Sequence, residues 1–197
     1  MSNSVKGKFI IVSGPSGSGK TTLHKALLES QRLKGKLVKS LSATTRPRRQ
    51  GERHGRDYLF LDTDVFEKRI GQDYFLEWEK VFDNYYGTPK RQALNLLKKG
   101  INVLLCIDVK GAKQVREKYP QAVSIFIKTP TIKILEDRLR KRASETHETL
   151  SARLKVARAE LKQAKHYDYQ LINGHLGRAT KELEKIVLEA LGMDNCH

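Results

Sequence analysis

One short segment contains residue types at a spacing that suits the binding of a phosphate chain. Residues 14–21 read Gly-Pro-Ser-Gly-Ser-Gly-Lys-Thr and fit the pattern G-x-x-x-x-G-K-S/T without a mismatch. The glycines let the backbone approach phosphate oxygens closely, because no Cβ stands in the way. In such a loop Lys20 reaches the β- and γ-phosphates, and the Thr21 hydroxyl binds Mg²⁺. The segment therefore predicts a site for a nucleoside triphosphate, formed by Gly14, Pro15, Ser16, Gly17, Ser18, Gly19, Lys20, Thr21 and Thr22.

The sequence around this segment supplies the elements that must position it. Residues 8–12 form a short β-branched and aromatic run, Lys-Phe-Ile-Ile-Val, which predicts a buried strand. From Thr22 to Leu28, apolar residues recur at helical spacing. A strand, a glycine turn and a helix N-terminus in this order point backbone N–H groups and a helix dipole at one spot. The order of these elements therefore favours the phosphate-binding interpretation.

The rest of the chain alternates between strand-like and helix-like segments. Buried strands are predicted at residues 102–107 and 122–127, with a weaker one at 169–172. Helices are predicted from about Gly111 to Tyr119 and from about Arg178 to Leu191. A length of 197 residues suits one such unit with insertions. We therefore expect an α/β fold, with a parallel sheet flanked by helices.

Two stretches interrupt this alternation. Residues 41–92 contain a loop rich in Arg and Gly, followed by short alternating runs that predict an inserted small antiparallel sheet. Residues 131–166 predict a basic helical hairpin. The expected organisation is a discontinuous core with an insert and a helical lid, the core being formed by residues 1–40, 93–130 and 167–197.

The net charge is the unusual feature of the composition. Lys and Arg total 38 against 22 Asp and Glu, which gives a formal net charge of +16. Such a surface attracts polyanions, but the basic residues are spread along the chain and no aromatic platform for single strands is evident. We interpret the charge as a basic surface with an anion-lined cleft, and do not expect nucleic acid as a partner.

Neither a membrane nor an oxidising compartment is indicated. No apolar run approaches the length of a membrane span, and the N-terminus lacks a long apolar signal region. The two cysteines, Cys106 and Cys196, lie far apart and do not make a disulfide framework. We expect a cytoplasmic protein without a membrane partner, and the sequence leaves the oligomeric state open.

Five further blocks follow the phosphate loop in a characteristic order. They are SATTRPRRQGE at residues 42–52, GRDY at 55–58, FLEW at 75–78, NYYGT at 84–88 and IDVKG at 107–111. With these blocks, the chain resembles guanylate kinases over essentially its full length. The resemblance implies a phosphate-loop NTPase core. It also implies transfer of the γ-phosphoryl group from ATP, with Mg²⁺, to GMP and dGMP, which gives ADP and GDP for purine nucleotide metabolism.

The insert carries residues that suit a nucleoside monophosphate. Arg46 and Arg49 lie near Tyr58 and Tyr86 in the expected insert, and guanidinium and phenol groups suit a dianionic phosphate. Arg48 remains unassigned. By resemblance, the GMP-binding residues are Ser42, Arg46, Arg49, Tyr58, Glu77, Tyr86, Thr88 and Asp108.

Glu77 is the candidate for reading the base. Strand alternation gives it the face opposite both of its neighbours, Leu76 and Trp78, and we expect Trp78 in the core. A carboxylate at this position can accept hydrogen bonds from guanine N1–H and the N2 amino group together. The alternative for Glu77 is an exposed strand residue.

Asp108 ends a buried strand at the edge where parallel sheets place their ligands. By resemblance it helps to organise Mg²⁺ or substrate, so the expected metal-binding residues are Thr21 and Asp108. The family often has an acidic residue two positions earlier, where this chain has Cys106. We interpret Cys106 as an inert small hydrophobic residue.

The hairpin carries the candidate lid arginines. Arg138 and Arg142 lie four positions apart and share a helix face, and Arg153 follows on the next helix. By resemblance they close on the triphosphate and, with Lys20 and Arg46, form the catalytic set. Asn173 resembles a family position near the adenine.

Two other function classes remain as alternatives. Guanylate-kinase-like modules also serve as protein-binding scaffolds without catalysis, although such modules typically degrade the phosphate loop that is intact here. A phosphate-loop kinase acting on nucleic-acid ends is favoured only by the charge.

Overall fold

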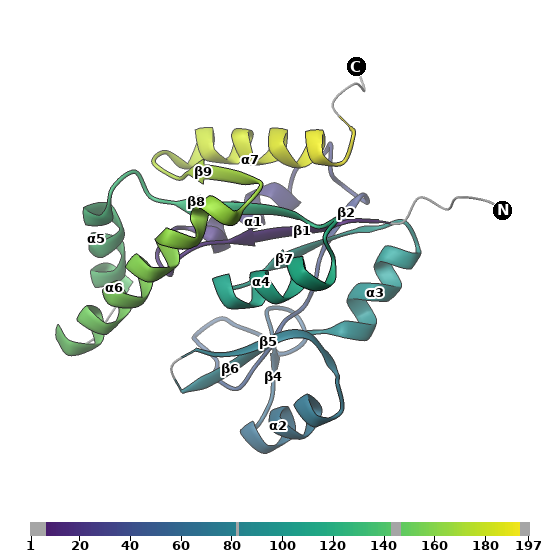
Figure 1. Cartoon of the computed structure of the whole chain (residues 1–197), viewed down its shortest axis with the longest axis horizontal. Helices are drawn as coiled ribbons and strands as arrows, with labels where there is room; N and C mark the ends of the chain where they lie inside the picture. The colour runs from purple at the N-terminus through teal and green to yellow at the C-terminus, as the bar shows by residue number, and fades with distance from the viewer. Residues whose placement is uncertain (1–6, 82, 143–146, 194–197) are drawn as a thin grey trace.

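The core of the protein is a five-stranded sheet, in a computed structural model that describes residues 7–81, 83–142 and 147–193 (Figure 1). The side chains of residues 142 and 147–149 lie outside the described part. Every neighbouring pair in the order β2-β7-β1-β8-β9 is parallel, which confirms the expected sheet. The strands are β1 (Phe9–Ser13), β2 (Leu37–Lys39), β7 (Asn102–Cys106), β8 (Val123–Lys128) and β9 (Tyr169–Ile172).

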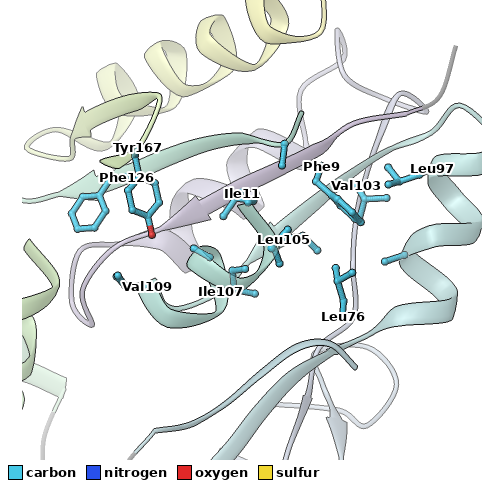
Figure 2. Close-up of a cluster of buried hydrophobic side chains, with 14 of the residues drawn as sticks. Phe9, Ile11, Leu76, Leu97, Val103, Leu105, Ile107, Val109, Phe126 and Tyr167 are labelled. Carbon is cyan, nitrogen blue, oxygen red and sulfur yellow. The ribbon is translucent and has the colours of Figure 1, made fainter. Parts of the chain in front are cut away.

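Helices cover both faces of this sheet, and alternate residues of β1 supply both cores. Ile10 and Val12 pack with α1 (Lys20–Leu28) and α7 (Leu176–Ala190). Phe9 and Ile11 point to the other face, where α3 (Lys90–Lys98) and α4 (Val109–Lys118) pack (Figure 2). All of β1 is buried, as is typical of a strand covered on both faces.

A second sheet of four strands lies beside α4, in the order β4-β3-β6-β5. Its elements are β3 (Ala43–Thr44), β4 (Leu59–Phe60), β5 (Phe75–Val81) and β6 (Asn84–Pro89), with α2 (Thr63–Gly71) packed on it. The sheet is mixed, because β3 pairs in parallel with β4 and antiparallel with β6. The expectation of an antiparallel sheet was therefore wrong for the β3–β4 pair. The long loop between these strands carries the chain back to the end of the sheet where β3 began, so β4 runs in the same direction as β3.

Strand β5 contains an irregularity that changes which side chains face inward. Phe75 pairs with Pro89 and Glu77 pairs with Thr88, so the register passes over Leu76. Pro89 has no N–H to donate to the ladder, which suits a bulge at this point. Leu76 and Glu77 are both buried, whereas Trp78 is 38% exposed. The predicted alternation therefore fails between Leu76 and Glu77, and the expected core position of Trp78 was wrong.

The helical hairpin is formed by α5 (Ile132–Arg142) and α6 (His147–Leu161), followed by a short 3₁₀ turn, η1 (Lys162–His166). Its two helices pack through Leu135, Leu139, Leu150 and Ala157. In Figure 1 the pair projects beyond one end of the parallel sheet. The exact division into core, insert and lid stays a prediction. Within the described ranges, no helix is both long enough and apolar enough to cross a membrane.

Candidate active site

Glycine shapes the phosphate loop at two close approaches. Gly14 and Gly19 have φ values of 140° and 92°, which side chains rarely adopt. A Cβ at Gly14 would collide with the backbone carbonyl of Ile127, and a Cβ at Gly19 would collide with the side-chain amide of Asn173. The backbone of the loop therefore lies close to β8 and to the segment that follows β9.

Lys20 lies over this loop. Its Nζ donates to the carbonyl oxygens of Gly14 and Pro15, at 2.6 and 2.9 Å. The ammonium is thus already at the mouth of the loop, where incoming phosphate oxygens can replace the two carbonyls.

A cavity of about 250 Å³ lies between the phosphate loop, the second sheet and α6. It is lined by four parts of the chain: the phosphate loop, the second sheet with its adjoining loops, residues 106–108 and helix α6. The predicted site residues among its lining are Gly14, Ser16, Gly17, Gly19, Lys20, Thr21, Ser42, Tyr58, Glu77, Tyr86, Asp108 and Arg153. Other predicted residues lie outside this lining: Pro15, Ser18, Thr22, Arg46, Arg49, Thr88, Arg138 and Asn173. The Arg142 side chain lies outside the described residues.

Glu77 presents a buried carboxyl group to this cavity. Its side chain is 3% exposed, and Thr88 Oγ1 donates to its Oε1 at 2.6 Å. Burial raises the pKa of this carboxyl to about 7, and nearby Asp108 adds to the rise, while Thr88 and Lys118 oppose it. An acceptor this poorly hydrated gains most from a ligand that donates to it.

Arg46 is held beside the cavity by a residue that the sequence analysis did not single out. Its guanidinium forms a two-pronged pair with Glu52, at 2.7 and 2.6 Å. The backbone N–H of Arg49 also donates to Glu52, at 2.9 Å. The Arg46 guanidinium lies 5.1 Å from the ring centre of Tyr58. The signal that could have found Glu52 is its place six residues after Arg46 in the same polar loop.

Asp108 caps the helix that follows β7. Its Oδ1 accepts from the backbone N–H of Gly111 at 2.8 Å, so α4 begins at Val109, two residues earlier than predicted. Burial raises the pKa of its carboxyl above the usual range, and the hydrogen bond from Gly111 opposes the rise.

Cys106 also lines the cavity, beside a neutral histidine. Its Sγ lies 3.1 Å from His24 Nδ1, and the same Nδ1 lies 3.1 Å from the Lys20 carbonyl. Burial raises the pKa of the thiol to about 11 and lowers that of His24 to about 4. A thiol that stays protonated is a poor nucleophile, which agrees with the inert role expected for Cys106.

Asn173 joins the lid to the phosphate loop. Its side-chain Nδ2 donates to the Ser18 backbone carbonyl at 2.8 Å, and its backbone carbonyl accepts from Arg138 Nη2 at 3.1 Å. Asn173 is 5% exposed. In this structure its amide therefore braces the loop, and a contact with adenine stays a prediction.

Comparison with known proteins gives a consistent result. The sequence model of the guanylate kinase family matches residues 6–190. The chain belongs to the guanylate kinase family. It is 44% identical to a guanylate kinase of Carboxydothermus hydrogenoformans over 92% of this chain and 88% of the relative. It is 45% identical to one of Syntrophomonas wolfei over 93% and 92%. A crystal structure of guanylate kinase from Anaplasma phagocytophilum aligns with a TM-score of 0.77 at 32% identity, and covers 98% of this chain and 89% of that one.

This guanylate kinase fold brings a further carboxyl group into the cavity. Glu160, in the last turn of α6, lines the same space as Lys20 and Asp108. Burial raises the pKa of its carboxyl to about 7, and Lys20 opposes the rise. Sequence reasoning missed Glu160, although its spacing from Arg153 places both on one face of the helix.

For a guanylate kinase with this Glu77, GMP affinity is expected to rise with pH. Only the ionised carboxylate can accept from both guanine donors, so between pH 8 and pH 6 the affinity should fall about tenfold if the pKa is about 7. The readout for GMP binding is the fluorescence of Trp78, the only tryptophan, which adjoins Glu77 in the sequence. The phosphate of GMP titrates in the same range, so the Glu77→Gln variant is the control that isolates the carboxyl.

The raised pKa of Glu77 also makes the stability of the fold depend on pH, but here the effect is that stability falls as pH rises. Because the folded-state pKa of Glu77 lies above its usual 4.5, the folded protein binds the proton more tightly than the unfolded chain. This contribution to stability is therefore present at low pH and is lost as pH rises from about 4.5 through about 7.

For the binding prediction, a GMP affinity that is equal at pH 6 and pH 8 after subtraction of the control would contradict the assignment of Glu77 as the residue that reads guanine.

Proposed function

We propose that the chain transfers the γ-phosphoryl group of ATP to GMP within the cavity described above, which gives ADP and GDP. Membership of the guanylate kinase family supports this activity. One observation carries it for this chain: the phosphate loop and the buried carboxyl of Glu77 line the same cavity. A group that binds phosphates thus faces a group that binds a base with two adjacent donors.

The proposed catalysis depends on positioning and on charge. Ser42, Glu77 and Thr88 hold the guanine end of GMP, and Arg46, Arg49, Tyr58 and Tyr86 hold its phosphate. Asp108 organises substrate and Mg²⁺ near the phosphates. Lys20 and the lid residues Arg138, Arg142 and Arg153 stabilise the negative charge that develops on the transferring group. Closure of the lid over both nucleotides would bring the arginines that lie outside the present cavity, Arg138 among them, to the phosphates.

The donor atoms present also suit the Mg²⁺ that accompanies ATP. Thr21 and Asp108 both line the cavity, and Mg²⁺ prefers hydroxyl and carboxylate oxygens such as theirs as ligands. Bound there, the ion would neutralise charge on the phosphate oxygens. Among the described residues, no cluster of three or more His, Cys, Asp or Glu offers an all-protein metal site, which fits an ion held mainly by the nucleotide.

The intact Lys20 and Thr21 argue against the scaffold alternative, because a module that only binds proteins has no use for them. A cytoplasmic location and use of dGMP are further parts of this proposal.

An acceptor panel tests the proposal directly. With ATP and Mg²⁺, ADP release should be fast with GMP and dGMP, and slower by roughly 10⁴ in kcat/KM with AMP. CMP and UMP should also be poor acceptors. GMP binding without turnover would overturn the kinase assignment, and equal turnover of GMP and AMP would overturn the proposed preference for guanine.

A further inference from the structure

Helix α4 grips strand β5 on both sides of Glu77. The Gln114 side-chain amide donates to the Trp78 backbone carbonyl at 2.8 Å. The Trp78 backbone nitrogen lies 3.5 Å from the Oε1 atom of Gln114. One turn later, Lys118 donates to the Leu76 carbonyl at 3.2 Å. The residues before and after Glu77 are therefore both held through their backbone by side chains of α4.

The Lys118 contact falls on the bulge itself. Leu76 is the residue that the β5–β6 register passes over, so its carbonyl finds a partner on the helix. At this bulge both Leu76 and Glu77 are buried, Leu76 in the hydrophobic core and Glu77 in the lining of the cavity. The helix thus stabilises the irregular backbone that directs the Glu77 carboxyl into the cavity.

Gly111 lies one turn before Gln114 and faces the carboxyl directly. A Cβ at Gly111 would collide with Glu77 Oε2 and would lie 3.1 Å from Glu77 Cδ. The carboxyl cannot easily move aside, because Thr88 holds its other oxygen and the side chain is buried. Gly111 has no positive φ, so the conformation of α4 itself does not demand a glycine here.

We propose that Gly111, Gln114 and Lys118 are positioning residues for base recognition, so that guanine selectivity depends on a core helix as well as on the insert. Gly111 leaves the space that the base-reading carboxyl occupies, and Gln114 and Lys118 hold the bulged strand that presents it. The inference rests on the proposed role of Glu77, which the Glu77→Gln variant tests separately.

The decisive variant is Gly111→Ala, measured by steady-state kinetics with GMP and AMP. The added methyl group displaces Oε2, so KM for GMP should rise about tenfold or more with a smaller change in kcat. The preference for GMP over AMP should fall by a similar factor, while KM for ATP stays unchanged. The matched control is Gly71→Ala in α2 of the insert, where a Cβ meets nothing within 4 Å. Both replacements favour helix, so a general effect of alanine would appear in both.

A double-mutant cycle separates the direct contact from a general disturbance of α4. Glu77→Asp shortens the side chain by one methylene, so adding Gly111→Ala to it should cost much less than in the wild type. A well-folded Gly111→Ala protein with unchanged base preference would overturn the proposal, and so would strictly additive costs in the cycle. If Gly111→Ala does not fold, Gln114→Ala decides instead: a raised KM for GMP supports the proposal, and unchanged kinetics reject it.

Discussion

Replacing Lys20 by methionine is expected to lower kcat by roughly 10³ while GMP affinity stays within about twofold of wild type. In the structure the Lys20 ammonium lies on the phosphate loop, bonded to the carbonyls of Gly14 and Pro15. We expect it to contact only the donor phosphates, because Glu77, the residue proposed to read the base, belongs to a different sheet. Methionine is unbranched and only one atom shorter than lysine, and it removes the charge and the hydrogen-bond donors. Turnover and GMP binding should therefore separate, as measured by ADP release and by Trp78 fluorescence.

The control for this variant is Lys25→Met, on the same helix but exposed. It removes one positive charge from the same region and should leave kcat close to wild type. Loss of GMP binding together with turnover in Lys20→Met would show that the two nucleotide sites are not separate.

Replacing Glu77 by glutamine is expected to lower kcat/KM for GMP by about 3 kcal/mol of transition-state binding, or more than a hundredfold. The carboxylate can accept from N1–H and the N2 amino group together, but the amide offers one acceptor oxygen and one donor. Adenine has a bare acceptor at N1, and the amide can donate to it. The preference for GMP over AMP should therefore narrow, and the pH dependence of GMP binding near pH 7 should weaken.

Glu67→Gln supplies the comparison, because Glu67 is an exposed carboxylate of the insert that accepts from Tyr85 at 2.9 Å, away from the cavity. Its nucleotide preference should match wild type. A Glu77→Gln protein that still prefers GMP by the original factor would show that another group reads the base.

Sequence reasoning predicted the parallel sheet and the phosphate loop because both depend on local signals. The apolar run before Gly14 and the helical spacing after Lys20 identify a strand and a helix without any knowledge of distant residues. The same holds for Asp108, which follows a continuous apolar strand and therefore had to lie at the ligand-binding edge of the sheet.

The errors arose where distant residues decide the local structure. Trp78 is exposed because the bulge opposite Pro89 breaks the alternation that predicted it in the core. Strand β2 is only three residues long, too short to be recognised from its sequence, and it pairs with the distant strand β7. The role of Gly111 depends on a carboxyl group from another strand, which no spacing within the IDVKG block reveals.

The brace between Asn173 and Ser18 joins residues 155 positions apart. Central strand β1 likewise pairs with β7 and β8, which both follow it by about 90 residues or more, so it has no strand partner in this sheet until they have been made. During synthesis the phosphate loop is therefore made long before the side chain that supports it. The braced form of the loop can therefore arise only after the segment that follows β9 has been made.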